Sequence, residues 1–166
     1  MTAMVTVGAG TWISAVYSFT RPNDTTAYTA GDLVANNATA GSVVAMSWIV
    51  RRDAQAYNLA GVRLRKSGNT ATNASFRLHF YTAVPTVANG DNGALAATQT
   101  ANYVGNVSVT LIGGNDGASN VAMASPALPF VLTPVSGVRT IYGLIEATGA
   151  YTPAAQEVFS TQIYLA

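Results

Sequence analysis

Apolar and polar residues alternate along many short stretches of this chain, and this alternation limits the possible folds more than any other feature. In the clearest stretch, Phe76, Leu78 and Phe80 fall on one face of a strand, and Arg77 and His79 on the other. Val, Ile, Thr, Tyr and Phe dominate such stretches, as is typical of strands. Because no window carries an apolar stripe of helical period with a cap at each end, the pattern predicts an all-β fold.

A second alternating stretch comes shortly before the first. Val62 and Leu64 point inward in this reading, while Arg63 and Arg65 point outward. Residues 66–69 begin a polar connection between the two stretches. We therefore expect the two strands to pair as a hairpin.

Further strands are expected between clusters of Gly, Asn, Asp and Pro that are typical of turns. They are Trp12–Thr20, Asp32–Ala35, Ser42–Arg51, Tyr103–Leu111, Phe130–Thr133, Thr140–Thr148 and Glu157–Leu165. About nine short strands in one domain favour a β-sandwich, and the length favours a jelly roll among sandwiches.

The chain has the length of one domain, 166 residues, and can bury a core of its own. It contains no cysteine, so packing and backbone pairing must hold it together. We assign residues 12–166 to a single β-sandwich domain. Residues 1–11 are rich in small side chains and form either an extended arm or a first strand.

Charge is scarce in this sequence. The formal net charge is +1, and charged residues make up 9% of the chain where about 25% is usual. Such a balance gives no strong attraction to nucleic acid or to anionic membranes. The polar residues that interrupt the uncharged stretch before Arg21 also argue against a signal peptide or a membrane span. We expect a protein that is made and assembled in a cytoplasm and contacts other protein.

The residues that carry most enzyme chemistry are few. His79 is the only histidine, and no Gly-x-Ser-x-Gly turn is present. Most acidic residues fall in or beside turns, and the glutamates Glu146 and Glu157 flank the last connection. Asp91-Asn92-Gly93 and Asn115-Asp116-Gly117 supply too few oxygen ligands for calcium. We predict no catalytic residue, no cofactor and no metal.

One set of side chains stands out as a candidate binding surface. If the two alternating strands pair, their cationic residues share one outer sheet face beside Tyr81. The predicted partner-binding residues are Arg63, Arg65, Arg77 and His79. Carboxylates on a partner would relieve the repulsion among them. The alternative is a solvated face whose arginine stems cover apolar surface.

Several longer runs of the sequence resemble a group of bacteriophage virion proteins. These runs amount to about a quarter of the chain and are Phe19–Ala35, Arg63–Gly68, Asn73–Tyr81, Ile141–Ala147 and Ala150–Ala154. The resemblance implies a capsid decoration, or cement, protein: a β-sandwich or jelly roll that binds the expanded shell as a dimer or trimer. Its partner would be the major capsid protein and its location the capsid surface. The resemblance brings no residue-level functional motif.

A second function stays open at this point, that of a tail- or fibre-associated module that binds a host glycan. Such a module needs an exposed aromatic platform, for which Trp12, Trp48 and Tyr151 are the candidates. Their apolar bulk favours the core or an interface instead.

Overall fold

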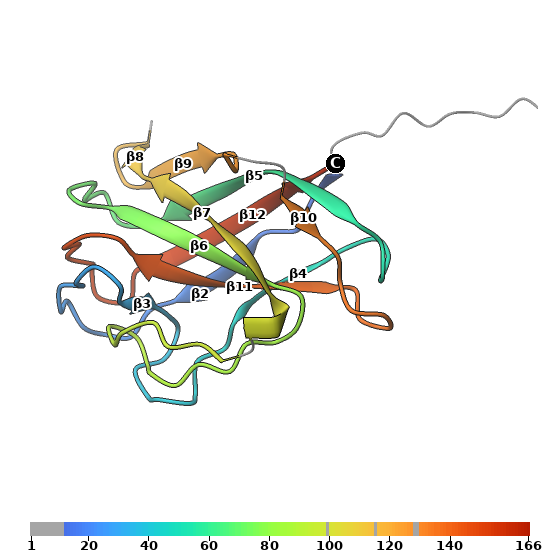
Figure 1. Cartoon of the computed structure of the whole chain (residues 1–166). Coiled ribbons are helices and arrows are strands. Elements are labelled where there is room, and N and C mark those ends of the chain that lie inside the picture. The colour runs from blue at the N-terminus through green and yellow to red at the C-terminus, as the bar shows by residue number, and fades with distance from the viewer. Residues whose placement is uncertain (1–11, 99, 115, 128–129) are drawn as a thin grey trace, which may run out of the picture.

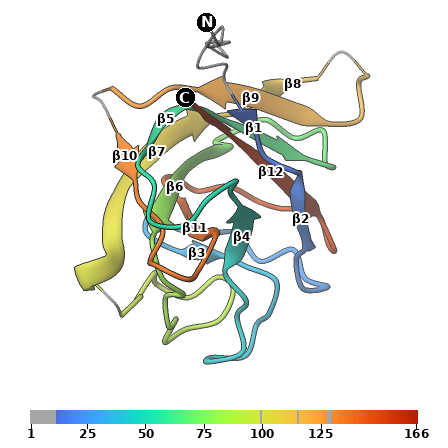
Figure 2. The ribbon, with the colours of Figure 1, turned by 90° about the vertical axis from the view of Figure 1, so that its right-hand side faces the viewer.

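The computed structural model describes residues 12–98, 100–114, 116–127 and 130–166, and the predicted arm over residues 1–11 lies outside them. The described part of the chain is all-β and includes a single helical turn, the 3-10 helix η1 (Thr100–Asn102). Two antiparallel sheets pack face to face (Figures 1 and 2). The predicted β-sandwich is therefore confirmed.

The larger sheet has seven strands, in the order β1-β12-β5-β9-β8, with β2 also paired to β12 and β10 to β5. Its strands are β1 (Trp12–Ile13), β2 (Tyr17–Thr20), β5 (Tyr57–Lys66), β8 (Ile112–Gly113), β9 (Asn120–Ala124), β10 (Val131–Leu132) and β12 (Val158–Leu165). The smaller sheet has five, in the order β3-β11-β6-β7, with β4 also paired to β11. They are β3 (Leu33–Val34), β4 (Met46–Ile49), β6 (Ser75–Tyr81), β7 (Tyr103–Thr110) and β11 (Thr140–Ala147).

Several strands are short because two of them share one partner. β1 and β2 both pair with β12, β3 and β4 with β11, and β9 and β10 with β5. If each such pair counts as one position and the two-residue strand β8, which lies at the edge of the larger sheet beside β9, is left out, eight positions remain. The first position then pairs with the eighth (β12) and the second with the seventh (β11). The third (β5) likewise pairs with the sixth, and the fourth (β6) with the fifth (β7). Segments from the two ends of the chain thus lie side by side in both sheets.

The predicted strand Trp12–Thr20 is broken in the middle. Ser14 explains the break, because its hydroxyl accepts a hydrogen bond from the backbone N–H of Ile163 at 3.0 Å. A side chain thereby occupies a position in the ladder that a backbone carbonyl would otherwise fill.

The predicted hairpin between residues 62–65 and 76–81 is wrong. β5 lies in the larger sheet and β6 in the smaller one, so residues 67–74 cross between sheets instead of forming a tight turn. The end of β5 is already paired on both sides, since Lys66 lies opposite Phe159 of β12 and Asn120 of β9. No edge of β5 is left there for β6.

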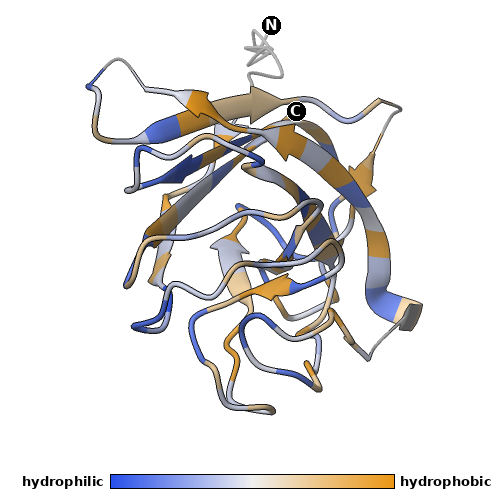
Figure 3. Cartoon of the chain, turned by 90° about the vertical axis from the view of Figure 1, so that its left-hand side faces the viewer, coloured by the Kyte–Doolittle hydropathy of each residue, from blue (hydrophilic) through white to orange (hydrophobic). Residues whose placement is uncertain are grey.

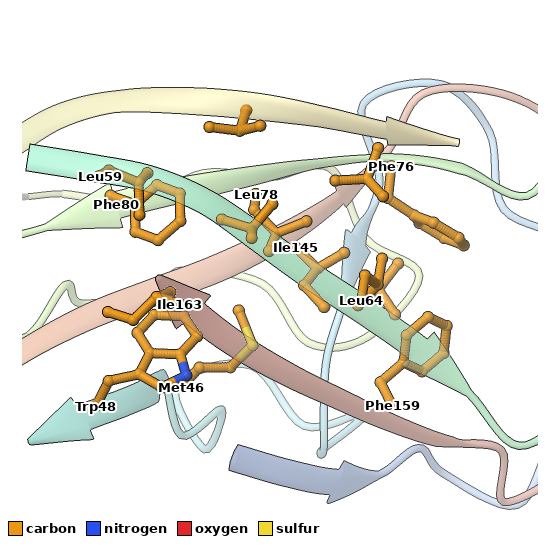
Figure 4. Close-up of a cluster of buried hydrophobic side chains, with 14 of the residues drawn as sticks. Met46, Trp48, Leu59, Leu64, Phe76, Leu78, Phe80, Ile145, Phe159 and Ile163 are labelled. Atoms are coloured by element: carbon orange, nitrogen blue, oxygen red, sulfur yellow. The ribbon is translucent and has the colours of Figure 1, made fainter. Parts of the chain in front are cut away.

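The core between the sheets follows the alternation that the sequence shows, which is visible along the strands in Figure 3. Phe76, Leu78 and Phe80 are fully buried, as predicted. Figure 4 shows how they meet side chains of the larger sheet, and the ring of Phe76 packs edge-on against Phe159 at a centroid distance of 5.4 Å. Val62 and Leu64 are buried as well, with Arg63 and Arg65 on the opposite face of β5.

A second, smaller apolar cluster covers part of the outer face of the smaller sheet. Its buried members are Leu33, Ala35, Ala45, Tyr81, Val87 and Leu144. The long connection that follows β6 folds back here, since Leu33 N donates to Gly93 O and Leu95 N donates to Gly31 O, both at 2.8 Å. The loops after β3 and β6 accordingly gather at one end of the molecule (Figures 1 and 2).

Candidate functional site

The four cationic residues singled out in the sequence do not form one surface. Arg63 and Arg65 lie on the outer face of the larger sheet, and Arg77 and His79 on the outer face of the smaller sheet. The reason is the crossing between β5 and β6, which sends the two strands to opposite sides of the sandwich. The two faces are therefore described separately.

We call the outer face of the larger sheet the Arg63–Arg65 face. Residues directly opposite one another in a ladder point to the same side, so the register defines its rows. One row runs Gln162, Arg63, Met123, and the next runs Ser18, Ser160, Arg65, Val121, Ile112. Met123 and Ile112 are each 65% exposed. Ile13, opposite Tyr164 at the end of β12, and the neighbouring Val16 are about half exposed.

The arginines of this face differ in their partners. Arg65 Nη2 lies 3.4 Å from Asp116 Oδ2, and both side chains are half exposed. Hydrogen bonds from the Ser119 hydroxyl and from backbone N–H groups hold the pKa of Asp116 at about 2. Arg63 donates to Gln162 Oε1 at 3.3 Å. No carboxylate of the described residues lies within 4.0 Å of its guanidinium, which leaves it able to bind one from a partner.

The Arg63–Arg65 face is also hollowed in two places. One hollow, of about 100 Å³, is lined by Val16, Arg63, Arg65, Ser160, Thr161 and Gln162. The other, of about 280 Å³, is lined by Ala60, Gly61, Met123, Ala124, Ser125 and Tyr164. The smaller hollow places two arginines beside Val16, whereas small and apolar side chains line most of the larger one.

On the smaller sheet, Arg77 and His79 share one carboxylate, that of Glu146. Arg77 Nη1 lies 3.0 Å from Glu146 Oε2, and His79 Nε2 lies 2.7 Å from the same oxygen. The other ring nitrogen of His79, Nδ1, lies 3.2 Å from the hydroxyl of Tyr103, which also accepts a hydrogen bond from Asn106 Nδ2 at 2.8 Å. The expected repulsion between Arg77 and His79 is therefore offset by a carboxylate of the chain itself.

His79 points away from the core as predicted, yet it is only 8% exposed. The connection after β6 covers it. The expectation that His79 lies exposed on an outer face together with the arginines is therefore wrong. Burial lowers the pKa of His79, and the nearby Glu146 opposes that effect only in part. The lowered pKa favours the neutral imidazole. In that form, with Nε2–H donating to Glu146, Nδ1 accepts the hydroxyl proton of Tyr103.

Beside this cluster the smaller sheet carries an open hollow of about 230 Å³, which we call the Tyr103 hollow. It is lined by His79, Tyr81, Leu95, Ala97 and Tyr103. The Tyr103 ring lies 5.3 Å from the Tyr81 ring and 5.7 Å from the His79 ring, and it is 37% exposed. The lining combines aromatic rings with small apolar side chains from the covering loop.

Two buried ion pairs were missed by the sequence reasoning. Lys66 Nζ lies 2.9 Å from Glu157 Oε1, and Arg21 Nη2 lies 2.6 Å from Asp91 Oδ2, with all four side chains essentially inaccessible to water. One signal was available for the first pair. Lys66 follows Val62 and Leu64 in the inward phase of the alternation, which places its side chain inside. Asp91 lies within a turn cluster, and nothing in its neighbourhood indicates that its carboxylate points inward.

The aromatic residues proposed for a glycan platform belong to the core. Trp48 and Tyr151 are buried, and Trp12 is partly buried and packs against the same cluster. They cannot form an exposed platform in this fold.

Among the described residues, no three His, Asp or Glu side chains come close enough together to hold a metal ion. No helix in that part of the chain has the length and hydropathy needed to cross a membrane. Neither a scan against protein-family models nor a search of curated proteins finds a match for this sequence.

Proposed function

We propose that this chain is a non-enzymatic phage capsid decoration protein that binds the major capsid protein lattice through its Arg63–Arg65 face. The observation that carries the proposal is the composition of that face. Exposed Ile112 and Met123 surround two arginines on a rigid antiparallel ladder, and the surface carries few ions that must lose their water on binding.

Arg63 supports a specific orientation of the partner. Because no carboxylate of the described part of the chain pairs with Arg63, an Asp or Glu on the shell can bind its guanidinium through two parallel hydrogen bonds. Arg77 and His79 have no such role in the proposal, since Glu146 already engages both. Two arginines on a chain of net charge +1 would hold nucleic acid weakly, which favours protein as the partner.

The order of the strand positions supports the jelly-roll form of the sandwich. With the edge strand β8 left out, the first position pairs with the eighth, the second with the seventh, the third with the sixth and the fourth with the fifth, which is the winding of two successive Greek keys. We further propose that the protein binds as a dimer or trimer on the capsid surface after assembly in the host cytoplasm. Symmetric copies multiply moderate contacts, so each single face needs only modest affinity.

The surroundings of His79 support a protein without enzymatic activity. A general base must reach the proton that it removes from a substrate. Both ring nitrogens of His79 are engaged, by Glu146 and by Tyr103, and the ring is buried.

Co-sedimentation with assembled shells of the phage tests the proposal. The double variant Arg63→Gln/Arg65→Gln should bind roughly tenfold or more weakly and lose most of its salt dependence. The matched control is Arg51→Gln/Arg52→Gln, which removes the same charge from the exposed connection between β4 and β5. Equal binding by both double variants would remove the Arg63–Arg65 face from the mechanism, and wild-type protein left in the supernatant would contradict the decoration function itself.

A further inference from the structure

The Tyr103 hollow lies on the opposite side of the sandwich from the Arg63–Arg65 face, because the outer faces of two packed sheets point apart. The proposed function makes no use of it. Its walls come from β6, from β7 and from the loop that follows β6, and the hydrogen bonds of the covering loop hold them together.

The exposed aromatic ring in this hollow is held firmly. The Tyr103 hydroxyl is hydrogen-bonded to His79 Nδ1 and accepts a hydrogen bond from Asn106 Nδ2, while the ring contacts Tyr81 and His79. His79 is in turn fixed by Glu146. An aromatic ring that is pre-oriented by hydrogen bonds and still 37% exposed is suited to binding, since little conformational freedom remains to be lost.

The charge of the site indicates a neutral ligand. Arg77 and Glu146 form an ion pair at 3.0 Å, and among the residues that the structure describes no charged side chain lines the hollow besides the titratable His79. A charged ligand would find no free counter-ion there. It would also have to lose its hydration against apolar walls.

The hydrogen-bonding groups next to the hollow indicate a ligand with hydroxyls. Asn106 is exposed and uses one amide N–H to bond Tyr103, so its carbonyl oxygen and second N–H remain as an acceptor and a donor. Arg77, two residues from His79 on the outer face of β6, has a side chain that is 39% exposed and donors beyond the one that bonds Glu146. An apolar peptide side chain would leave these groups without partners, whereas a sugar ring offers C–H faces to the aromatic ring and hydroxyls to Asn106 and Arg77.

We propose that the Tyr103 hollow is a binding site for a neutral hexose residue of a glycan. Tyr103 stacks on the sugar ring, Leu95 and Ala97 form the opposite wall, and Asn106 with Arg77 bonds the hydroxyls. A single open site of this kind binds with a dissociation constant on the order of 1 mM. Many copies on one surface would raise the effective affinity.

NMR, both ligand-observed and protein-observed, tests this site. The probes are methyl glucoside, methyl galactoside, methyl mannoside and N-acetylglucosamine. At least one probe should shift resonances of Tyr103 and Ala97, and Tyr103→Ala should weaken that binding at least tenfold. The matched control Tyr164→Ala removes a tyrosine from the opposite face of the sandwich and should leave the affinity for that probe unchanged. Glucuronate and glucosamine, the charged counterparts, should bind more weakly than the neutral probe.

A second variant, Asn106→Ala, removes an exposed side chain together with its hydrogen bond to the Tyr103 hydroxyl. It should weaken binding severalfold while thermal unfolding stays near that of the wild type. Absence of binding by every neutral probe, or full binding by Tyr103→Ala, would overturn the site. A change of oligomeric state in Tyr103→Ala, seen by analytical ultracentrifugation, would overturn it too, by making the hollow an interface between copies. Shell binding by Tyr103→Ala should equal that of the wild type, so this proposal and the proposed function fail independently.

Discussion

The pair Lys66–Glu157 gives the sharpest test of how this fold is held together. Lys66 Nζ bonds Glu157 Oε1 at 2.9 Å and Gly68 O at 3.0 Å, and lies 5.0 Å from the centre of the Tyr151 ring. The second oxygen of Glu157 accepts a hydrogen bond from the Tyr151 hydroxyl. Burial is the main cause that raises the pKa of Tyr151, so this hydroxyl keeps its proton. Both charges are almost completely removed from water.

Replacing Lys66 by Met leaves the Glu157 carboxylate buried without its counter-ion. Breaking such a pair costs about 3–5 kcal/mol, where the whole stability of a domain is about 5–15 kcal/mol. In the double variant Lys66→Met/Glu157→Gln no uncompensated charge remains, and the amide oxygen can still accept the bond from Tyr151. The free energy of unfolding should therefore fall less in the double variant than the sum of its decreases in the two single variants. The difference, the interaction energy, should be about 2 kcal/mol.

Urea unfolding followed by tryptophan fluorescence measures the free energy of unfolding for the wild type and the three variants. The matched surface control is Arg65→Gln, because its ion pair with Asp116 is half exposed and exposed pairs contribute about 0–1 kcal/mol. If Lys66→Met lowers the free energy of unfolding by less than about 1 kcal/mol, or if the effects of the two single variants are strictly additive in the double variant, the buried pair does not stabilise the fold as argued.

Further expectations concern the core, a glycine and pH. Leu78→Ala should cost about 2–5 kcal/mol in chemical denaturation, because Leu78 is fully buried between the sheets; a negligible change would contradict its place in the core. Gly68→Ala should lower the melting temperature, since a Cβ at Gly68 would overlap Glu157 Oε1; an unchanged value would show that Glu157 can move aside. Folding depresses the pKa of His79, so the unfolded chain takes up a proton first and stability should fall as pH drops below about 6.5. In His79→Gln the free energy of unfolding should change less between pH 7 and pH 5.5, and identical slopes would exclude His79 as the source.

The faces of individual strands could be predicted from the sequence because alternation is a local property. Phe76, Leu78 and Phe80 are buried as expected, and Arg63 and Arg65 lie on the outer face of β5. The partner of a strand is a long-range property. The sequence contains no short turn that would force β5 and β6 together, and the hairpin expectation rested on their proximity along the chain.

The candidate site was predicted only in part for the same reason. Alternation places His79 on the outer face of β6, but it says nothing of the loop that closes over it from Val87 to Ala97. Likewise the bond between His79 and Glu146 depends on the pairing of β6 with β11, which joins residues 67 positions apart. The Tyr103 hollow, built on these contacts, therefore emerges only in three dimensions.

The most direct test of the central claim is the oxidation of Met123 in protein that co-sediments with assembled phage shells. Met123 lies beside Arg63 on the Arg63–Arg65 face and is 65% exposed in the free protein. Mass spectrometry after brief peroxide treatment should find Met123 oxidised in free protein and protected in the pelleted complex. A complex that forms while Met123 stays fully reactive would contradict docking through this face, and a protein that never pellets with its shells would contradict the decoration function.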